Sequence, residues 1–233
     1  MIGEREGTIL EMLVREYIRT AEPVSSEKIA KRMRNALSPA TVRSIFTDLT
    51  DAGFIEQPHT SGGRVPCQKG YRFFVDMILD DSGRTGSVPG AVERMIAQVE
   101  DDYSAMRSLQ NMLARHFHVL SRFEDFAPVG FEEVFREPEF QESDLIRKFG
   151  RFLDEFEGVQ NRYSEELTPN SFEVYIGDEN NIQPIANVSM IVAKDNAGRL
   201  FFMAGPARMY YDRIIPTMRL WHKKPAIKNH KKT

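Results

Sequence analysis

Cysteine is nearly absent from this chain of 233 residues, which has only Cys67. A single cysteine excludes an internal disulfide. No run approaches 18 uncharged apolar residues, so the sequence predicts no transmembrane helix. The first seven residues, Met-Ile-Gly-Glu-Arg-Glu-Gly, are too polar for a signal peptide. These absences predict a soluble cytoplasmic protein with no membrane partner.

The usual signatures of catalysis are also missing. We find no nucleophile with a paired base and no glycine-rich phosphate loop, so we expect neither an enzyme nor a cofactor. Glu179 and Asn180 have no His or Cys at metal-ligand spacing, which argues against a metal site. Arg208 is expected to form a buried ion pair, with Glu179 as the candidate partner.

An overall excess of positive charge is lacking, because the formal net charge is −3. The distribution of charge is more informative than the sum. Residues 25–47 contain five basic side chains and one acid, and residues 57–75 contain three basic side chains and no acid. Acids gather in the middle of the chain. A local basic surface of this kind can bind phosphates on an anionic protein.

The first 79 residues have the pattern of a DNA-binding domain. Apolar residues at three- and four-residue steps predict a helix over about 4–19, and Ser25 is a good cap for a second helix. Ser38 and Pro39 begin a third helix that ends near Gly53. Two short strands, 54–57 and 64–66, are joined by a glycine-rich turn. Three helices followed by a hairpin predict a winged helix-turn-helix.

Residues 80–90 are a linker by composition, and a long helix is expected over 91–122. Apolar residues recur there at heptad spacing, which favours a coiled coil and a homodimer. The alternative is a helix that packs on the core of its own domain. The candidate dimerisation residues are Val92, Met95, Val99, Met106, Leu109 and Leu113.

The region 130–222 is mixed. We expect a helix over 143–163, strands over 172–176, 186–193 and 199–203, and a final helix over 210–221. Residues 195–198 are a hairpin turn. Residues 223–233 form a basic tail. The predicted fold class is therefore α+β, with a small antiparallel sheet in the second part.

Several blocks, in order along the chain, resemble the HrcA family of heat-inducible repressors. The blocks fall in the third helix, in and after the hairpin, and in the C-terminal region. They are Leu37–Arg43, Pro58–Pro66, Lys69–Asp76, Pro138–Phe140, Val174–Asn180 and Gly205–Tyr211. The resemblance implies a nucleoid-associated bacterial repressor of chaperone operons. It would bind an inverted-repeat operator as a dimer and be kept active by the chaperonin.

The chain departs from the family pattern at three sites and in its length. The family usually has Ala at Gly62, Thr at Cys67, and Asn-Asp-Met at residues 44–46. The chain is also short for the family, because the resemblance leaves no counterpart for the family's dimerising insertion or for the first strands of its GAF-like domain. We therefore expect a reduced GAF-like domain with a sheet of about three strands.

In a winged helix, the third helix lies in the DNA major groove. Arg43 is the first candidate for a guanine contact, and its alternatives are a phosphate contact or a surface ion pair. His59 and Thr60 either contact the DNA backbone or stabilise the turn. The complete set of expected DNA-binding residues is Ser38, Ala40, Thr41, Arg43, Ser44, Thr47, His59, Thr60, Arg64, Lys69 and Arg72.

Two other classes of function compete with a stress repressor. A winged-helix regulator that senses a small ligand predicts a closed apolar pocket in the C-terminal domain. A protein-interaction module predicts that the basic faces of the third helix and the hairpin do not matter.

Overall fold

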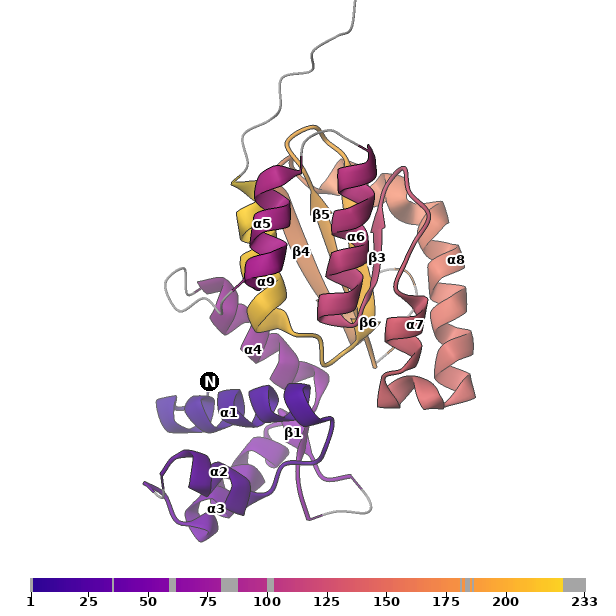
Figure 1. The fold of residues 1–233 in the computed structure, drawn as a ribbon. Helices are drawn as coiled ribbons and strands as arrows, with labels where there is room; N and C mark the ends of the chain where they lie inside the picture. Colours follow the sequence, from indigo (N-terminus) through magenta and orange to yellow (C-terminus); the bar gives the residue numbers. More distant parts are fainter. Residues whose placement is uncertain are drawn as a thin grey trace, which may run out of the picture. The chain divides into compact units, whose positions relative to one another are not determined.

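The computed structural model describes residues 2–34, 36–58, 62–80, 88–99, 103–180, 182, 185 and 187–223. Contacts within the chain divide it into two compact units, Met1–Asp81 and Ser82–Thr233 (Figure 1). The expected linker falls mostly outside the described residues, as does all but Lys223 of the basic tail.

The first unit contains helices and a short hairpin. Its elements are α1 (Glu4–Thr20), α2 (Ser26–Arg32), α3 (Pro39–Asp51), β1 (Ile55–Glu56), β2 (Val65–Pro66) and α4 (Gln68–Asp80). The strands β1 and β2 are antiparallel, with Ile55 opposite Pro66. The apolar periodicity that predicted the first helix is the face that α1 buries, through Ile9, Leu10, Leu13, Val14 and Ile18. The order of three helices and a hairpin agrees with the prediction.

The second unit is built around a four-stranded antiparallel sheet in the order β3-β6-β5-β4. Its elements are α5 (Gly90–Gln98), α6 (Tyr103–Phe117), β3 (Leu120–Phe123), α7 (Phe131–Phe135), η1 (Pro138–Gln141), α8 (Ser143–Glu166), β4 (Ser171–Ile176), η2 (Gly177–Glu179), β5 (Val188–Lys194), β6 (Leu200–Pro206) and α9 (Tyr211–His222). The α+β class is confirmed, and the sheet has one more strand than expected.

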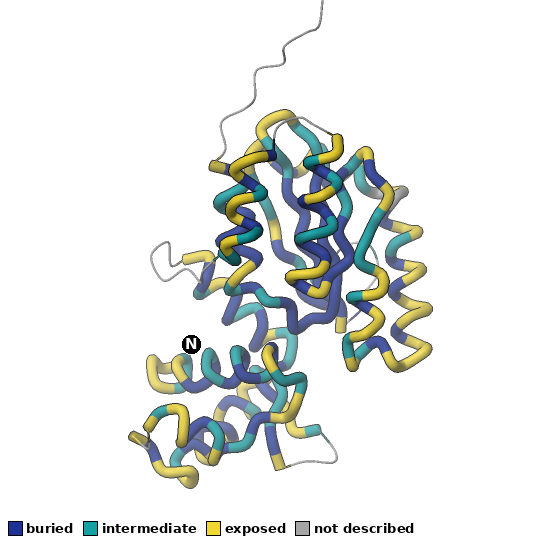
Figure 2. The backbone as a smooth tube through the Cα atoms, viewed as in Figure 1, coloured by how far each residue is buried: buried dark blue, intermediate teal, exposed yellow. Residues whose placement is uncertain are grey.

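Helices cover both faces of this sheet. The helix α8 lies over one face, and α5, α6 and α9 lie over the other (Figure 1). Figure 2 shows the consequence, because the central strands β5 and β6 are buried along almost their whole length. Strands that are covered on both faces form continuous apolar runs, as Met190–Ala193 does here.

The single long helix predicted over 91–122 is wrong. The helix α5 ends at Gln98, and Val99 has an extended backbone with a ψ of 115°. A second helix begins at Tyr103, and Leu120–Phe123 is not helical but forms the edge strand β3. The physical reason is that heptad spacing only marks residues that become buried. Here two separate helices and a strand bury them against one sheet.

The candidate dimerisation residues are therefore core residues of the second unit. Val92, Val99, Met106, Leu109 and Leu113 are each at most 5% exposed, and Met95 is half-buried. Packing within the unit, which was the alternative, accounts for this burial. Their part in a dimer stays a prediction.

Candidate nucleic-acid interface

Two serine caps determine where α2 and α3 begin. The Ser25 hydroxyl accepts a hydrogen bond from the backbone N–H of Lys28 at 3.2 Å. The Ser38 hydroxyl accepts one from the backbone N–H of Thr41 at 3.1 Å, and Pro39 occupies the first turn, where a missing N–H costs nothing. These caps set the start of α3 and therefore the face that it presents to solvent.

The helix α3 has one apolar face and one small, polar face. Val42, Ile45, Phe46 and Leu49 are buried. The residues on the other face are exposed, and they are Ser38, Ala40, Arg43, Ser44 and Thr47, with Thr41 half-buried at the edge. A surface of short side chains with one arginine can approach a DNA groove closely. The structure thus brings six of the predicted DNA-binding residues onto one helix.

Three of the predicted hydroxyl groups are already engaged in contacts at α3. The hydroxyls of Ser38 and Thr41 lie 2.9 Å apart, and the Thr47 hydroxyl donates to the Arg43 carbonyl oxygen at 3.2 Å. A hydroxyl oxygen that donates in this way still accepts hydrogen bonds. These contacts hold the side chains close to the helix and leave Arg43 as its longest projecting group.

Arg43 makes an ion pair that ties α3 to α2. Its guanidinium donates to the Glu27 carboxylate at 3.1 Å, and the two side chains are 65% and 53% exposed. Hydrogen bonds from the backbone N–H of Glu27 and from the Ser25 hydroxyl lower the pKa of Glu27, which is therefore ionised at neutral pH. Exposed ion pairs contribute little to stability. The pair can therefore open at little cost when Arg43 meets another acceptor.

The hairpin is attached to the rest of the first unit through Arg64. Its backbone N–H and carbonyl form two hydrogen bonds with Val24, at 2.9 and 2.8 Å. The half-buried side chain donates to the Gly63 carbonyl at 3.3 Å. Gly63 itself must lack a side chain, because a Cβ there would lie 2.7 Å from the backbone of Pro23. His59 and Thr60 lie outside the described residues.

Lys69 and Arg72 have structural partners that the sequence did not indicate. The Lys69 ammonium donates to the Ala52 carbonyl at 2.8 Å, at the C-terminal end of α3, and lies 4.4 Å from the centre of the Phe54 ring. The Arg72 guanidinium pairs with Asp76 one turn later in α4. Lys69 thus holds the C-terminal end of α3, whereas Arg72 pairs within α4. Their phosphate contacts stay a prediction.

One cluster was missed in the sequence. Glu16 on α1 is fully buried, and it accepts contacts from Lys28 at 2.8 Å, from Arg19 at 2.6 Å and from Arg32. Burial raises the pKa of Glu16, but hydrogen bonds from Lys28 and Arg19 and the charge of Arg32 outweigh burial and lower it. The signal was present, because Glu16 falls on the apolar face of the first helix, where a carboxylate needs cationic partners.

The expected partner of Arg208 is wrong. Arg208 is 5% exposed and pairs with Glu137 and Glu139, whereas Glu179 accepts the backbone N–H of Ile176 at 2.9 Å. His118 joins the cluster through Glu137, at 2.7 Å. Residues far apart in sequence meet here, so spacing could not identify the pair. Within the described ranges, no group of three or more His, Cys, Asp or Glu side chains could hold a metal ion.

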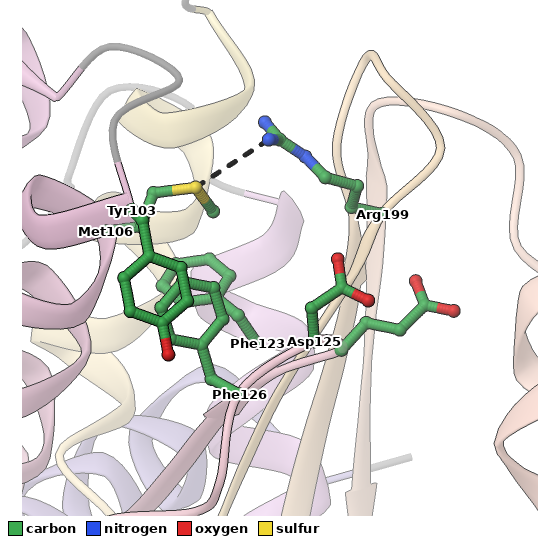
Figure 3. Close-up of a pocket in the computed structure, with 7 residues that line it drawn as sticks. Tyr103, Met106, Phe123, Asp125, Phe126 and Arg199 are labelled. Atoms are coloured by element: carbon green, nitrogen blue, oxygen red, sulfur yellow. Dashed lines mark hydrogen bonds between the residues drawn. The ribbon is translucent and has the colours of Figure 1, made fainter.

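A small cavity of about 170 Å³ in the second unit has both aromatic and charged walls but no catalytic arrangement (Figure 3). Tyr103 stacks on Phe126 with ring centres 4.4 Å apart. The Arg199 guanidinium pairs with Asp195 at 2.8 Å and lies 3.6 Å from the Met106 sulfur. The ion pair between Arg199 and Asp195 stabilises the turn between β5 and β6.

None of the helices in the described part of the chain is long and apolar enough to cross a membrane.

Comparison with known proteins identifies the family. The family described as HrcA protein C terminal domain matches residues 81–215, which is more than half of the chain. The chain therefore belongs to the HrcA family, as its sequence blocks predicted.

The curated relatives have the same family name. A protein from Desulforudis audaxviator is 38% identical over 127 residues, which is 54% of this chain and 35% of the relative. A protein from Halalkalibacterium halodurans is 51% identical over 79 residues, which is 34% of this chain and 23% of the relative. Both are called heat-inducible transcription repressor HrcA, a name that describes a regulator and not an enzyme. The matched part spans little more than a third of the first relatives' length.

A solved structure supports the fold. The crystal structure of a hypothetical protein aligns with a TM-score of 0.76 at 18% identity, and the alignment covers 95% of this chain and 97% of that one. At this identity the similarity shows the fold alone.

Proposed function

We propose that this chain is a transcriptional repressor of heat-shock (chaperone) operons that binds an inverted-repeat operator as a dimer. In this proposal, the first unit is a winged helix-turn-helix and the second a reduced GAF-like regulatory domain. The names of the relatives support repression. Only family resemblance supports modulation by the chaperonin.

The observation that carries the proposal is the exposed face of α3. This face presents Ala40, Ser44 and Thr47 around Arg43, which is 65% exposed. The guanidinium fork matches the O6 and N7 acceptors of guanine in the major groove. Arg64, which directly precedes β2, would contact a phosphate or the minor groove. In this arrangement, Glu27 would release Arg43 when the protein binds DNA.

The proposal is tested by footprinting the full chain on DNA upstream of the host's chaperonin operon, over a series of salt concentrations. We expect an inverted repeat to be protected at low salt. Protection of no such repeat would show that the repressor function is wrong. Equal binding to that DNA and to an unrelated duplex would show that the protein lacks the expected specificity.

Variants of Arg43 separate a base contact from a phosphate contact. Arg43→Lys keeps the charge but loses the fork, so it should relax the base preference at one position by about 1–3 kcal/mol while leaving the salt slope unchanged. Arg64→Ala should weaken binding to all sequences alike and reduce the salt slope by about 1. Arg147→Ala, at a 76% exposed position of the second unit, is the matched control and should bind normally.

The homodimer has its own test. Sedimentation of the full chain at micromolar concentration should show a dimer, and a monomer there would contradict this part of the proposal. Because five of the six heptad residues are buried within their unit, substitution of the half-buried Met95 is the least disruptive probe of that surface.

A further inference from the structure

A second and larger cavity, of about 280 Å³, lies on the face of the sheet that α8 covers. Its walls come from β3, from the segment that leads into α7, from α8 and from β6. All of the residues that line it belong to the second unit. The cavity is separate from the candidate nucleic-acid interface, which belongs to the first unit.

The floor of this cavity is aromatic and apolar. The rings of Phe156 and Phe202 are stacked with centres 4.1 Å apart, and both side chains are at most 3% exposed. Leu120, which is fully buried, extends the same surface. These residues belong to the core between α8 and the sheet. A flat apolar molecule would therefore exchange water for contact with a preformed aromatic surface.

The remaining walls carry charges of opposite sign. Arg122 on β3 is half-buried and pairs in register with Phe202 on β6, so the two side chains lie on the same face of the sheet. Asp154 is exposed on α8 and lines the same cavity. A guanidinium binds a carboxylate, and a carboxylate binds an ammonium. A cavity with only apolar walls would not distinguish such groups.

The cavity is open to solvent on the side of α7 and α8. Phe131 is 39% exposed at its edge. Gly150 lines it from the middle of α8, and a Cβ at this glycine would meet nothing within 4 Å. A small molecule can therefore enter without rearrangement of the backbone.

We propose that this cavity binds a small zwitterion with an apolar body, of the class of the hydrophobic α-amino acids. The carboxylate would face Arg122, the ammonium Asp154, and the side chain the Phe156–Phe202 pair. The size agrees, because a cavity of about 150 Å³ holds benzene, and this one is large enough for a phenyl ring with a short polar end.

The test is calorimetric titration of the full chain, without DNA, with three probes. L-Phenylalanine has both charges, phenylacetate lacks the ammonium, and phenethylamine lacks the carboxylate. We expect saturable binding of L-phenylalanine with a Kd of about 0.1–1 mM, as suits a ligand of this size, and binding of either analogue at least fivefold weaker. Because no DNA is present, the result does not depend on the repressor proposal.

Two glycine variants show whether binding occurs in this cavity. Gly150→Leu places a side chain in the opening and should weaken L-phenylalanine binding at least tenfold. Gly158→Leu is the matched control, because this glycine lies on the same helix, a Cβ there also meets nothing within 4 Å, and it does not line the cavity. It should bind as the unmodified protein does.

Three results would overturn the proposal. One is no saturable heat with L-phenylalanine up to 10 mM, a limit about ten times the weakest expected Kd. Another is equal binding of phenylacetate or phenethylamine, which would refute recognition of both charges. The third is equal binding to the two glycine variants, which would place the ligand elsewhere.

Discussion

Substitution of Arg208 by methionine should strongly destabilise the second unit. Its guanidinium is 5% exposed and contacts the carboxylates of Glu137 and Glu139, which are 12% and 20% exposed. Burial lowers the pKa of Arg208, but hydrogen bonds and charges from Glu139 and Glu137 outweigh burial and raise it. The folded state therefore depends on the charged form of this side chain.

The size of the effect follows from what the variant leaves behind. Removing one partner of a buried ion pair costs about 3–5 kcal/mol, because the remaining charge is uncompensated. Here two carboxylates lose their common cation, while the partial exposure of both carboxylates reduces the cost. We therefore expect a loss of about 3 kcal/mol in the free energy of unfolding.

Fluorescence of Trp221 gives a direct assay. It is the only tryptophan in the chain, and its ring centre lies 5.5 Å from that of Phe123 in the second unit. Urea unfolding followed by this signal therefore reports on the second unit alone. Arg136→Ala is the control, because Arg136 is 73% exposed and pairs only one turn away with Glu132. It should change stability by no more than about 0.5 kcal/mol.

A compensating variant tests the cause. If the loss comes from uncompensated carboxylates, Glu137→Gln and Glu139→Gln added to Arg208→Met should recover part of it. A loss below about 1 kcal/mol for Arg208→Met, or no recovery in the combined variant, would refute the reasoning.

Three further outcomes are expected. Burial lowers the pKa of His222 to about 4, so the contribution of this residue to stability is present above pH 6.5 and is lost as the pH falls toward 4. His222→Phe should therefore remove about 2 kcal/mol of the pH dependence of stability between pH 7 and pH 5, measured by Trp221 fluorescence. An unchanged pH dependence would exclude His222 as its source. Because the pKa of Glu16 is lowered, its ion pairs stabilise the fold above about pH 4.5 and are lost below that pH. Glu16→Gln should flatten the acid-dependent fall in the Tm measured by circular dichroism. Equal slopes of Tm against pH for the variant and the unmodified protein would contradict this role of Glu16. Gly63→Ala should lower the free energy of unfolding by about 1–3 kcal/mol through overpacking. Gly62→Ala, whose Cβ meets nothing within 4 Å, should have the Tm of the unmodified protein. Equal Tm values for the two variants would refute the close approach of Gly63 to Pro23.

Elements with local signals were predictable. The caps Ser25 and Ser38 and the turn at residues 195–198 were identified from sequence, and the structure has hydrogen bonds at each of them. Such signals work because the donor and the acceptor are only a few residues apart. The same holds for the polar face of α3, which follows from helical periodicity once the cap is known.

The region 91–122 shows where this approach fails. Its heptad pattern correctly marked residues that become buried, but it could not say what would cover them. Leu120–Phe123 pairs with β6, whose residues lie far along the chain, and this pairing decides that the segment is a strand. The secondary structure of Leu120–Phe123 depends on its pairing with β6, and a pattern within a short stretch of sequence does not include that contact.

The sequence by itself determined the family, the α+β class and the residues on α3 that could contact DNA, because each depends on residue types at short, fixed spacings. Only the tertiary structure decided the partners of Arg43, Glu16 and Arg208, and the cavity beside Arg122. Those arrangements depend on how distant segments meet, since an ion pair forms between side chains that the fold brings within about 4 Å, whatever their separation in sequence.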